Sequence, residues 1–223
     1  MCPDKIPIFE KILSANDEVA HLNRKLLDSK GIFSINLMAS PGAGKTSLIL
    51  QTIQGLSGKI KIGVIEGDTA PVTIDADKIL AAGMPAVQIN TGGDCHLDAP
   101  MVRTGLTGLP LENIDLLIVE NVGNLVCPAA FDLGTHSNVL IASTPEGDDK
   151  PYKYPTIYRG VDALIINKID LLPYVKFNID YFKQGVEMLN EHLVTFQVSC
   201  VSGEGLSLWI SWLLDRVSKT RNR

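Results

Sequence analysis

The chain has 223 residues, 45% of them hydrophobic, and a formal net charge of −5. Its length suits one α/β domain that buries about 70% of its unfolded surface, and its acidic balance with scattered basic residues argues against a nucleic-acid partner. Because no apolar run approaches about 20 residues and the N-terminus lacks the pattern of a secretory signal, we expect a cytoplasmic protein without a membrane partner.

The first predicted element is an amphipathic helix at about residues 5–29. We interpret its apolar face as packed against the flank of the domain; the alternative interpretation is a surface for self-association or for a partner. The apolar side chains recur at intervals of three and four residues, as one face of a helix requires, at Ile12, Ala15, Val19, Leu22 and Leu26.

Seven short runs rich in apolar and β-branched residues follow, separated by turn residues and helical segments. Both faces of these runs are apolar, as in strands that are covered by helices on two sides. The alternation predicts an α/β fold with a mostly parallel sheet and right-handed crossovers, in a single P-loop domain over residues 1–223. The predicted strands are Ile32–Met38, Ile60–Ile65, Ala86–Asn90, Asp115–Glu120, Asn138–Ala142, Ala163–Asn167 and Val194–Ser199, and the closing helix is Gly205–Lys219.

A phosphate-binding loop joins the first strand to the next helix. The sequence Ala39-Ser-Pro-Gly-Ala-Gly-Lys-Thr46 matches the Walker A pattern, with Ala39 where the common pattern has glycine. The glycines let successive N–H groups face phosphate oxygens, and the helix adds the positive end of its dipole. We predict that Lys45 reaches the β- and γ-phosphates as a catalytic residue and that the Thr46 hydroxyl binds Mg²⁺. A glycine-rich turn without a ligand would not explain the Lys-Thr pair. The predicted nucleotide contacts are Gly42, Ala43, Gly44, Lys45, Thr46 and Ser47.

Acidic residues at the ends of two strands complete this nucleotide site. Asp68 follows the second strand and Glu120 ends the fourth, and a carboxylate there can hold Mg²⁺ directly or through water. We predict that Gly123 donates its N–H to the γ-phosphate and that Asp75 orients the attacking water. The alternative for Asp75 is a solvated residue at the start of a helix.

Cysteine and histidine residues lie just beyond two strands on the same side. Cys95 and His96 follow the third strand, and Cys127 follows the fourth. Two thiolates and an imidazole can bind Zn²⁺ or Ni²⁺, but the spacing alone leaves metal binding and buried, reduced cysteines open. Cys200 and His192 are interpreted as incidental, and His136 has no assigned role.

A guanine-reading motif is predicted after the sixth strand, at Asn167-Lys-Ile-Asp170. The Asp170 carboxylate can accept hydrogen bonds from the N1–H and the exocyclic amine of guanine, whereas adenine would leave it unpaired at a cost of ~1–3 kcal/mol or more. Lys168 can lie across the base, and Asn167 can tie this motif to the phosphate loop. Ser199, after the next strand, is a further candidate for contact with the base. The pair of motifs predicts a GTPase that forms GDP and phosphate.

In these motifs the chain resembles the HypB family, the GTPases that help deliver nickel to nickel–iron hydrogenases. The resemblance implies a fold of the signal-recognition and MinD-like class, a homodimer favoured by GTP, and a Ni²⁺ or Zn²⁺ site between subunits built from Cys95, His96 and Cys127. It also implies coupling of nucleotide state to dimerisation and metal binding, with other maturation proteins and the hydrogenase large subunit as partners. The matching stretches are residues 40–46, 66–68, 90–98, 120–128, 131–136 and 167–170.

Three other functions are compatible with parts of the sequence. A urease-type nickel-insertion GTPase shares the loop and base motifs but is expected to carry Cys-Pro-His, whereas here Cys95-His96 and Cys127-Pro128 are separate. A small-molecule P-loop kinase would need lid arginines, for which Arg103 and Arg159 are poor candidates. A zinc-stabilised regulatory GTPase would bind metal without delivering it.

Overall fold

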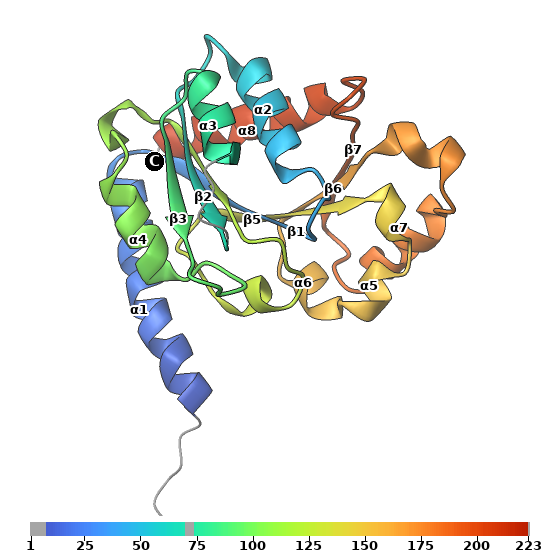
Figure 1. Ribbon diagram of the computed structural model, residues 1–223, viewed down its shortest axis with the longest axis horizontal. Helices are drawn as coiled ribbons and strands as arrows, with labels where there is room; N and C mark the ends of the chain where they lie inside the picture. Colours follow the sequence, from blue (N-terminus) through green and yellow to red (C-terminus); the bar gives the residue numbers. More distant parts are fainter. Residues whose placement is uncertain (1–7, 70–73, 223) are drawn as a thin grey trace, which may run out of the picture.

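Seven parallel strands form the centre of the structure (Figure 1). The computed structural model describes residues 8–69 and 74–222, with the side chains of residues 8–11 and 74–75 outside that description. The strand order is β3-β2-β4-β1-β5-β6-β7, and every neighbouring pair is parallel. The predicted α/β fold with a parallel sheet of seven strands is therefore confirmed. The strands are β1 (Phe33–Ala39), β2 (Ile62–Asp68), β3 (Ala86–Asn90), β4 (Leu116–Glu120), β5 (Ser137–Ser143), β6 (Ala163–Asn167) and β7 (Val194–Gln197).

Helices cover both faces of this sheet, as predicted. Figure 1 shows α2, α3 and α8 on one face and α1, α4, α6 and α7 on the other. The α-helices are α1 (Ile8–Ser29), α2 (Lys45–Leu56), α3 (Ile74–Ala81), α4 (Ala99–Thr107), α5 (Lys150–Lys153), α6 (Pro155–Arg159), α7 (Ile179–Glu187) and α8 (Leu206–Arg221). Short 3₁₀ helices lie at η1 (Leu111–Asn113), η2 (Cys127–Ala130), η3 (Thr144–Glu146) and η4 (Ile169–Tyr174). Within the described residues, none of the helices combines the length and the apolar character needed to cross a membrane.

The core is divided by the alternation of side chains along each strand. Ile35 and Leu37 of β1 pack with α2 and α8, where the buried Trp209 donates its Nε1–H to Thr52 Oγ1 over 2.9 Å. The opposite face holds two apolar clusters, one under α1 and α4 and the other under α6 and α7. Between these clusters β1 presents buried polar side chains, Ser34 and Asn36.

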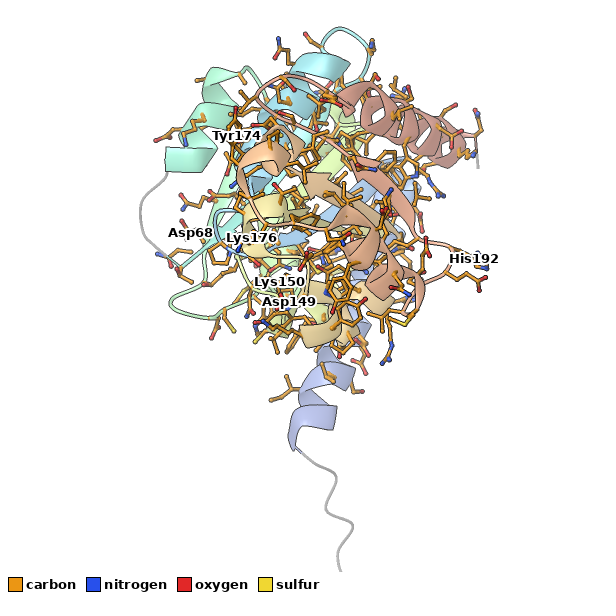
Figure 2. The ribbon with its side chains drawn as sticks, turned by 90° about the vertical axis from the view of Figure 1, so that its right-hand side faces the viewer. Asp68, Asp149, Lys150, Tyr174, Lys176 and His192 are labelled. Carbon is orange, nitrogen blue, oxygen red and sulfur yellow. The ribbon has the colours of Figure 1, made fainter. Side chains whose placement is uncertain are left out.

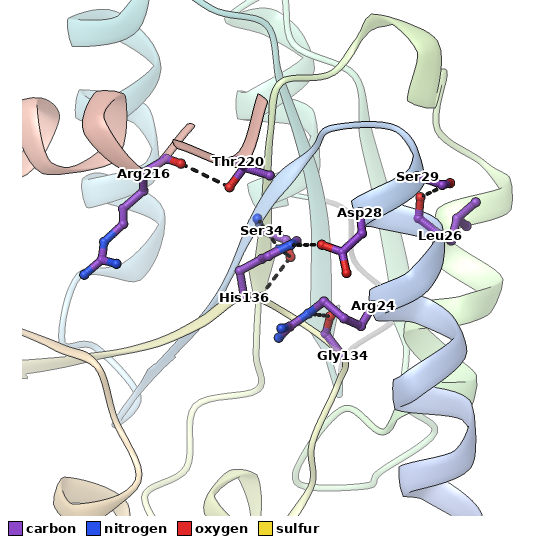
Figure 3. A network of polar contacts seen from close by, with 9 residues as sticks. All are labelled: Arg24, Leu26, Asp28, Ser29, Ser34, Gly134, His136, Arg216 and Thr220. Carbon is purple, nitrogen blue, oxygen red and sulfur yellow. Dashed lines mark hydrogen bonds and ion pairs between the residues drawn. The ribbon is translucent and has the colours of Figure 1, made fainter. Parts of the chain in front are cut away.

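His136 has a structural position in this polar strip (Figure 3). Its Nδ1 accepts hydrogen bonds from the backbone N–H and the hydroxyl of Ser34, at 3.1 and 2.7 Å. Its Nε2 lies 2.9 Å from a carboxylate oxygen of Asp28, on α1. The nearly buried ring therefore links α1 to β1 and β5, a role that the sequence pattern left unassigned.

The face of α1 that packs on the domain is not the predicted apolar stripe. Ile12 and Leu22 are 51% and 52% exposed, whereas the buried positions are Asn16, Ala20, Asn23 and Leu27. The helix does pack on the flank of the domain, as interpreted, but mainly through residues outside the predicted stripe; of the stripe, Leu26 packs against the apolar cluster under α4. The physical reason is that the two asparagines donate to backbone carbonyl groups of the domain, which a purely apolar criterion does not register. Residues 5–7 of the predicted helix lie outside the described residues, and the partner surface stays a prediction.

Candidate functional site

The candidate site lies where the seven parallel strands end. The carboxyl ends of parallel strands meet at one edge of a sheet, where α/β proteins bind their ligands. The loops after β1, β2, β4 and β6 carry the predicted nucleotide contacts, and those after β3 and β4 carry the cysteines and the histidine. His192, interpreted as incidental, precedes β7 and lies on the opposite side of the molecule from Asp68 (Figure 2).

The phosphate loop depends on two glycines in left-handed backbone conformations. Gly42 has φ 75° and Gly44 has φ 102°, and α2 begins directly after them at Lys45. A Cβ atom at Gly44 would lie 2.4 Å from Asn167 Nδ2, so both the conformation and the space at this position require glycine. The two glycines let the loop curve around the N-terminus of α2, so that backbone N–H groups can face a phosphate group.

The predicted magnesium ligands border a small acidic hollow. Thr46 Oγ1 donates to Glu120 Oε1 over 3.2 Å, and the hollow has a volume of about 240 Å³. Oxygen ligands of this kind suit Mg²⁺. The described residues that line the hollow are Pro41, Lys45, Glu66, Gly67, Asp68, Thr69, Glu120, Val122 and Gly123.

Glu66 belongs to this hollow although sequence reasoning did not select it. It is only 3% exposed and is the register partner of Glu120 across β2 and β4. Two buried carboxylates on neighbouring strands repel each other unless a proton or a cation lies between them. Their pairing depends on which strands are adjacent, a fact that the sequence does not give; the only signal was an acidic residue two positions before Asp68.

Gly123 lies directly against the phosphate loop. A Cβ atom at this position would be 3.0 Å from both Cα and N of Pro41. The segment after β4 therefore contacts the loop that is predicted to hold the β- and γ-phosphates. Asp75 lies in α3 with its side chain outside the described residues, so its catalytic role stays a prediction.

The base motif is tied to the phosphate loop by two hydrogen bonds. Asn167 Nδ2 donates to the Ala43 carbonyl over 2.9 Å, and Lys168 Nζ donates to the Gly42 carbonyl over 2.6 Å. Lys168 has φ 61°, the only positive φ of a non-glycine residue in the described part of the chain. Such a conformation costs about 1–3 kcal/mol and persists where surrounding contacts hold it; here the Lys168 carbonyl accepts from Thr144 Oγ1 over 2.7 Å.

Asp170 has a carboxylate oxygen that can accept a hydrogen bond from a ligand. Its Oδ1 atom is buried and has no hydrogen-bond partner among the described residues. A buried acceptor without a partner costs about 1–3 kcal/mol, and a pair of N–H donors from a base would remove that cost. The donor edge of guanine fits this requirement.

The Ser199 side chain forms hydrogen bonds within its own loop. It is fully buried, and its hydroxyl oxygen accepts from the backbone N–H groups of Val201 and Ser202, at 3.2 and 3.1 Å. Its predicted contact with the base stays a prediction. The neighbouring Cys200 is half-buried, and burial raises the pKa of its thiol to about 11.

Cys95, His96 and Cys127 come together beside the nucleotide site. Their ligand atoms all lie within 4.8 Å of one another, and the two sulfur atoms are 2.9 Å apart. The hydrogen bond from Cys95 to Cys127 raises the pKa of the Cys95 thiol, with desolvation adding to the effect. The His96 ring packs on Phe131 with a centroid distance of 4.0 Å. A donor set of two sulfurs and one imidazole suits a borderline-soft divalent cation, which displaces the thiol protons when it binds.

Comparisons with known proteins show the family of the chain. Residues 34–197 match the family model described as "CobW/HypB/UreG, nucleotide-binding domain". The chain is 45% identical to the hydrogenase maturation factor HypB of Rhizobium leguminosarum bv. viciae over 208 residues, which is 93% of this chain and 69% of that protein.

Solved structures show the same relationships. The structure of HypB from Helicobacter pylori in complex with nickel is 36% identical with a TM-score of 0.88, over 93% of this chain and 97% of that one. The signal recognition particle receptor FtsY of Elizabethkingia anophelis is 15% identical with a TM-score of 0.55, over 81% of this chain and 66% of that one. The second likeness shows the fold alone: the chain shares the α/β architecture of this receptor.

Proposed function

The chain belongs to the HypB family of hydrogenase maturation factors, and from this membership we propose that it is a GTP-hydrolysing metallochaperone that assists nickel insertion into a nickel–iron hydrogenase. The observation that carries this proposal is the Cys95–His96–Cys127 cluster at the end of the segment that contacts the phosphate loop. A simple GTPase has no need of two thiols and an imidazole beside its nucleotide site.

The nucleotide is GTP or GDP with Mg²⁺. Lys45 and the loop backbone would bind the phosphates, and Thr46 and Glu120 would hold Mg²⁺ together with Asp68. The bound cation lowers the cost of charge that develops on the phosphates. Gly123 would sense the γ-phosphate from its place against Pro41.

The metal at the cluster is Ni²⁺ as cargo, with Zn²⁺ as the competing ion of similar ligand preference. One chain offers three ligands, and a two-fold axis can complete the coordination with ligands from a second copy. We therefore propose a homodimer that GTP favours. Its partners are other hydrogenase maturation proteins and the hydrogenase large subunit.

A urease-type nickel-insertion GTPase is the nearest alternative. The family description includes UreG beside HypB, but the relatives that cover most of this chain at 42–45% identity are hydrogenase maturation factors. A zinc-stabilised regulatory GTPase is distinguished by experiment, since it would retain its metal when GTP is hydrolysed.

Asp170→Asn should change the nucleotide preference of the protein from GTP to xanthosine triphosphate. The amide can accept from N1–H and donate to the 2-oxo group of xanthine, but it cannot accept both donors of guanine. We expect GTP affinity to fall about 5–150-fold, the equivalent of ~1–3 kcal/mol, and xanthosine triphosphate to bind more tightly than GTP. Competition between the two nucleotides measures this, and Asp215→Asn, an exposed change of the same charge on α8, is the matched control. Unchanged preference for GTP would remove Asp170 from the site.

The same variant tests delivery. Protein loaded with Ni²⁺ is mixed with apo-hydrogenase large subunit, and transferred nickel is counted with each nucleotide. The wild type should transfer nickel with GTP, and Asp170→Asn with xanthosine triphosphate. If both proteins transfer the same amount of nickel with every nucleotide, the proposed role of hydrolysis is contradicted.

A further inference from the structure

A row of asparagine side chains crosses the face of the sheet that carries the two apolar clusters under α1, α4, α6 and α7. Asn36 Nδ2 on β1 donates to Asn138 Oδ1 on β5, and Asn121 Nδ2, after β4, donates to Asn36 Oδ1, both over 3.1 Å. Asn36 and Asn121 are 1% and 0% exposed. Buried amides are costly unless their hydrogen bonds are made, so the row fixes the relative positions of the segments that it joins.

The row ends on the loop that carries two of the metal ligands. Asn121 Oδ1 accepts from the backbone N–H of Leu97 over 3.0 Å and from that of Val122 over 2.9 Å. Leu97 directly follows His96. The side chain of Asn121 therefore holds the peptide group that joins His96 to Leu97.

The backbone of Asn121 belongs to the nucleotide site. The preceding residue is Glu120, whose carboxylate accepts from Thr46, and Gly123 two positions later lies against Pro41. A shift of this segment when the γ-phosphate is lost would move the Asn121 side chain with it. The movement would reach His96 through one hydrogen bond.

Asn124 makes a second connection to the same loop. Its Nδ2 donates to the Cys95 carbonyl over 3.2 Å, and its Oδ1 accepts from the N–H of Val126 over 2.9 Å. Cys95 and His96 are thus held on both sides by the segment from residue 121 to residue 126. Cys127, the third ligand, comes next in the chain.

The far ends of both ligand-bearing segments are held by α1. Asn16 accepts from the N–H of Ala99 and donates to the Asp132 carbonyl, both over 2.8 Å. Asn23 donates to the carbonyls of Ala99 and Leu133, at 2.9 and 3.1 Å. These contacts involve no residue of the nucleotide site. The segments that carry the metal ligands are therefore fixed to α1 at Ala99 and at Asp132 and Leu133. Their other ends would move together with residues 121–124.

We propose that Asn121 and Asn124 are positioning residues that transmit the nucleotide state to the Cys95-His96 loop. The inference rests on the proposed function, because it assigns a physical route to the coupling of GTP and metal binding. Neither residue is a ligand of the nucleotide or of the metal. Both act by setting where Cys95 and His96 stand relative to Cys127.

The test is the ratio of Ni²⁺ dissociation constants with GDP and with a non-hydrolysable GTP analogue. A coupled wild type should show a ratio of about 5–150-fold. In Asn121→Ala and Asn124→Ala this ratio should fall toward one, while Ni²⁺ still binds through the unchanged ligands. By linkage, the effect of Ni²⁺ on affinity for the GTP analogue should fall by the same factor, which a general loss of stability would not produce.

Asn190→Ala is the matched control. Asn190 also makes tertiary hydrogen bonds to two carbonyls, those of Tyr158 and Val161, but lies away from both sites, so its variant should keep the wild-type ratio. Thermal unfolding shows whether the buried Asn121→Ala variant folds; if it does not, the half-exposed Asn124→Ala decides. If the wild type shows coupling and the asparagine variants keep its ratio of Ni²⁺ dissociation constants, this inference is overturned and the proposed function stands. A wild type without coupling overturns both.

Discussion

Lys45→Ala should reduce GTP hydrolysis by at least ~10²-fold, the size typical of removing one preorganised group that stabilises developing charge. Lys45 lines the hollow beside Glu66 and Glu120 and is the one basic side chain among the described residues that line it. Its ammonium group is the group there that can neutralise charge on the β- and γ-phosphates. No arginine is among those lining residues either, so wild-type turnover should already be slow, because an arginine finger is worth roughly 10³–10⁵ in rate.

Ni²⁺ binding by the nucleotide-free variant should stay close to that of the wild type. Lys45 begins α2, whereas the metal ligands lie in the loops after β3 and β4. Single-turnover hydrolysis and a nickel titration on the same preparation measure both properties. Lys59→Ala is the matched control, since Lys59 is an exposed lysine that donates to the Gly55 carbonyl at the other end of α2. Wild-type turnover in Lys45→Ala would show that the lysine does not have the assigned role.

Cys127→Ala should weaken Ni²⁺ binding roughly 10²-fold or more. Four-ligand zinc sites have apparent binding free energies of ~10–16 kcal/mol, so each ligand contributes about 3 kcal/mol. Cys127 Sγ is 2.9 Å from Cys95 Sγ, so its loss removes one of the two sulfur donors. Charge-transfer absorption of the nickel–thiolate bond should decrease with the affinity.

Cys200→Ala is the control for this change. The Cys200 thiol is held protonated by a pKa of about 11 and lies beside the base motif, outside the cluster of metal ligands. Its replacement should leave nickel affinity and absorption unchanged. Equal effects of the two cysteine variants would mean that the cluster is not the metal site.

Much of the fold follows from local sequence patterns. The runs that became β4 and β6 are apolar on both faces because helices cover both sides of the sheet. The phosphate loop was recognisable because its glycines, lysine and threonine are contiguous and follow a strand. Such features depend only on residues that are close together in the chain, so they can be predicted from a single sequence.

Other features depend on which strands are adjacent. The pairing of Glu66 with Glu120 requires β2 beside β4, and the approach of Cys95 to Cys127 requires two loops from strands that β2 separates. The packing face of α1 was missed for a different reason. Asn16 and Asn23 are buried because they bond to backbone groups of distant segments, and no periodicity of apolar residues reports such bonds.

Nickel delivery by this protein requires that nucleotide state and metal affinity be coupled in one molecule. The most direct measurement is the affinity of the wild-type protein for Ni²⁺ and Zn²⁺, with GDP and with a non-hydrolysable GTP analogue, while light scattering follows its mass. We predict affinities that differ by about 5–150-fold between the two nucleotide states, with a dimer favoured by the GTP analogue. Identical affinities in both states, with a monomer throughout, would contradict the delivery mechanism and leave a GTPase that only happens to bind metal.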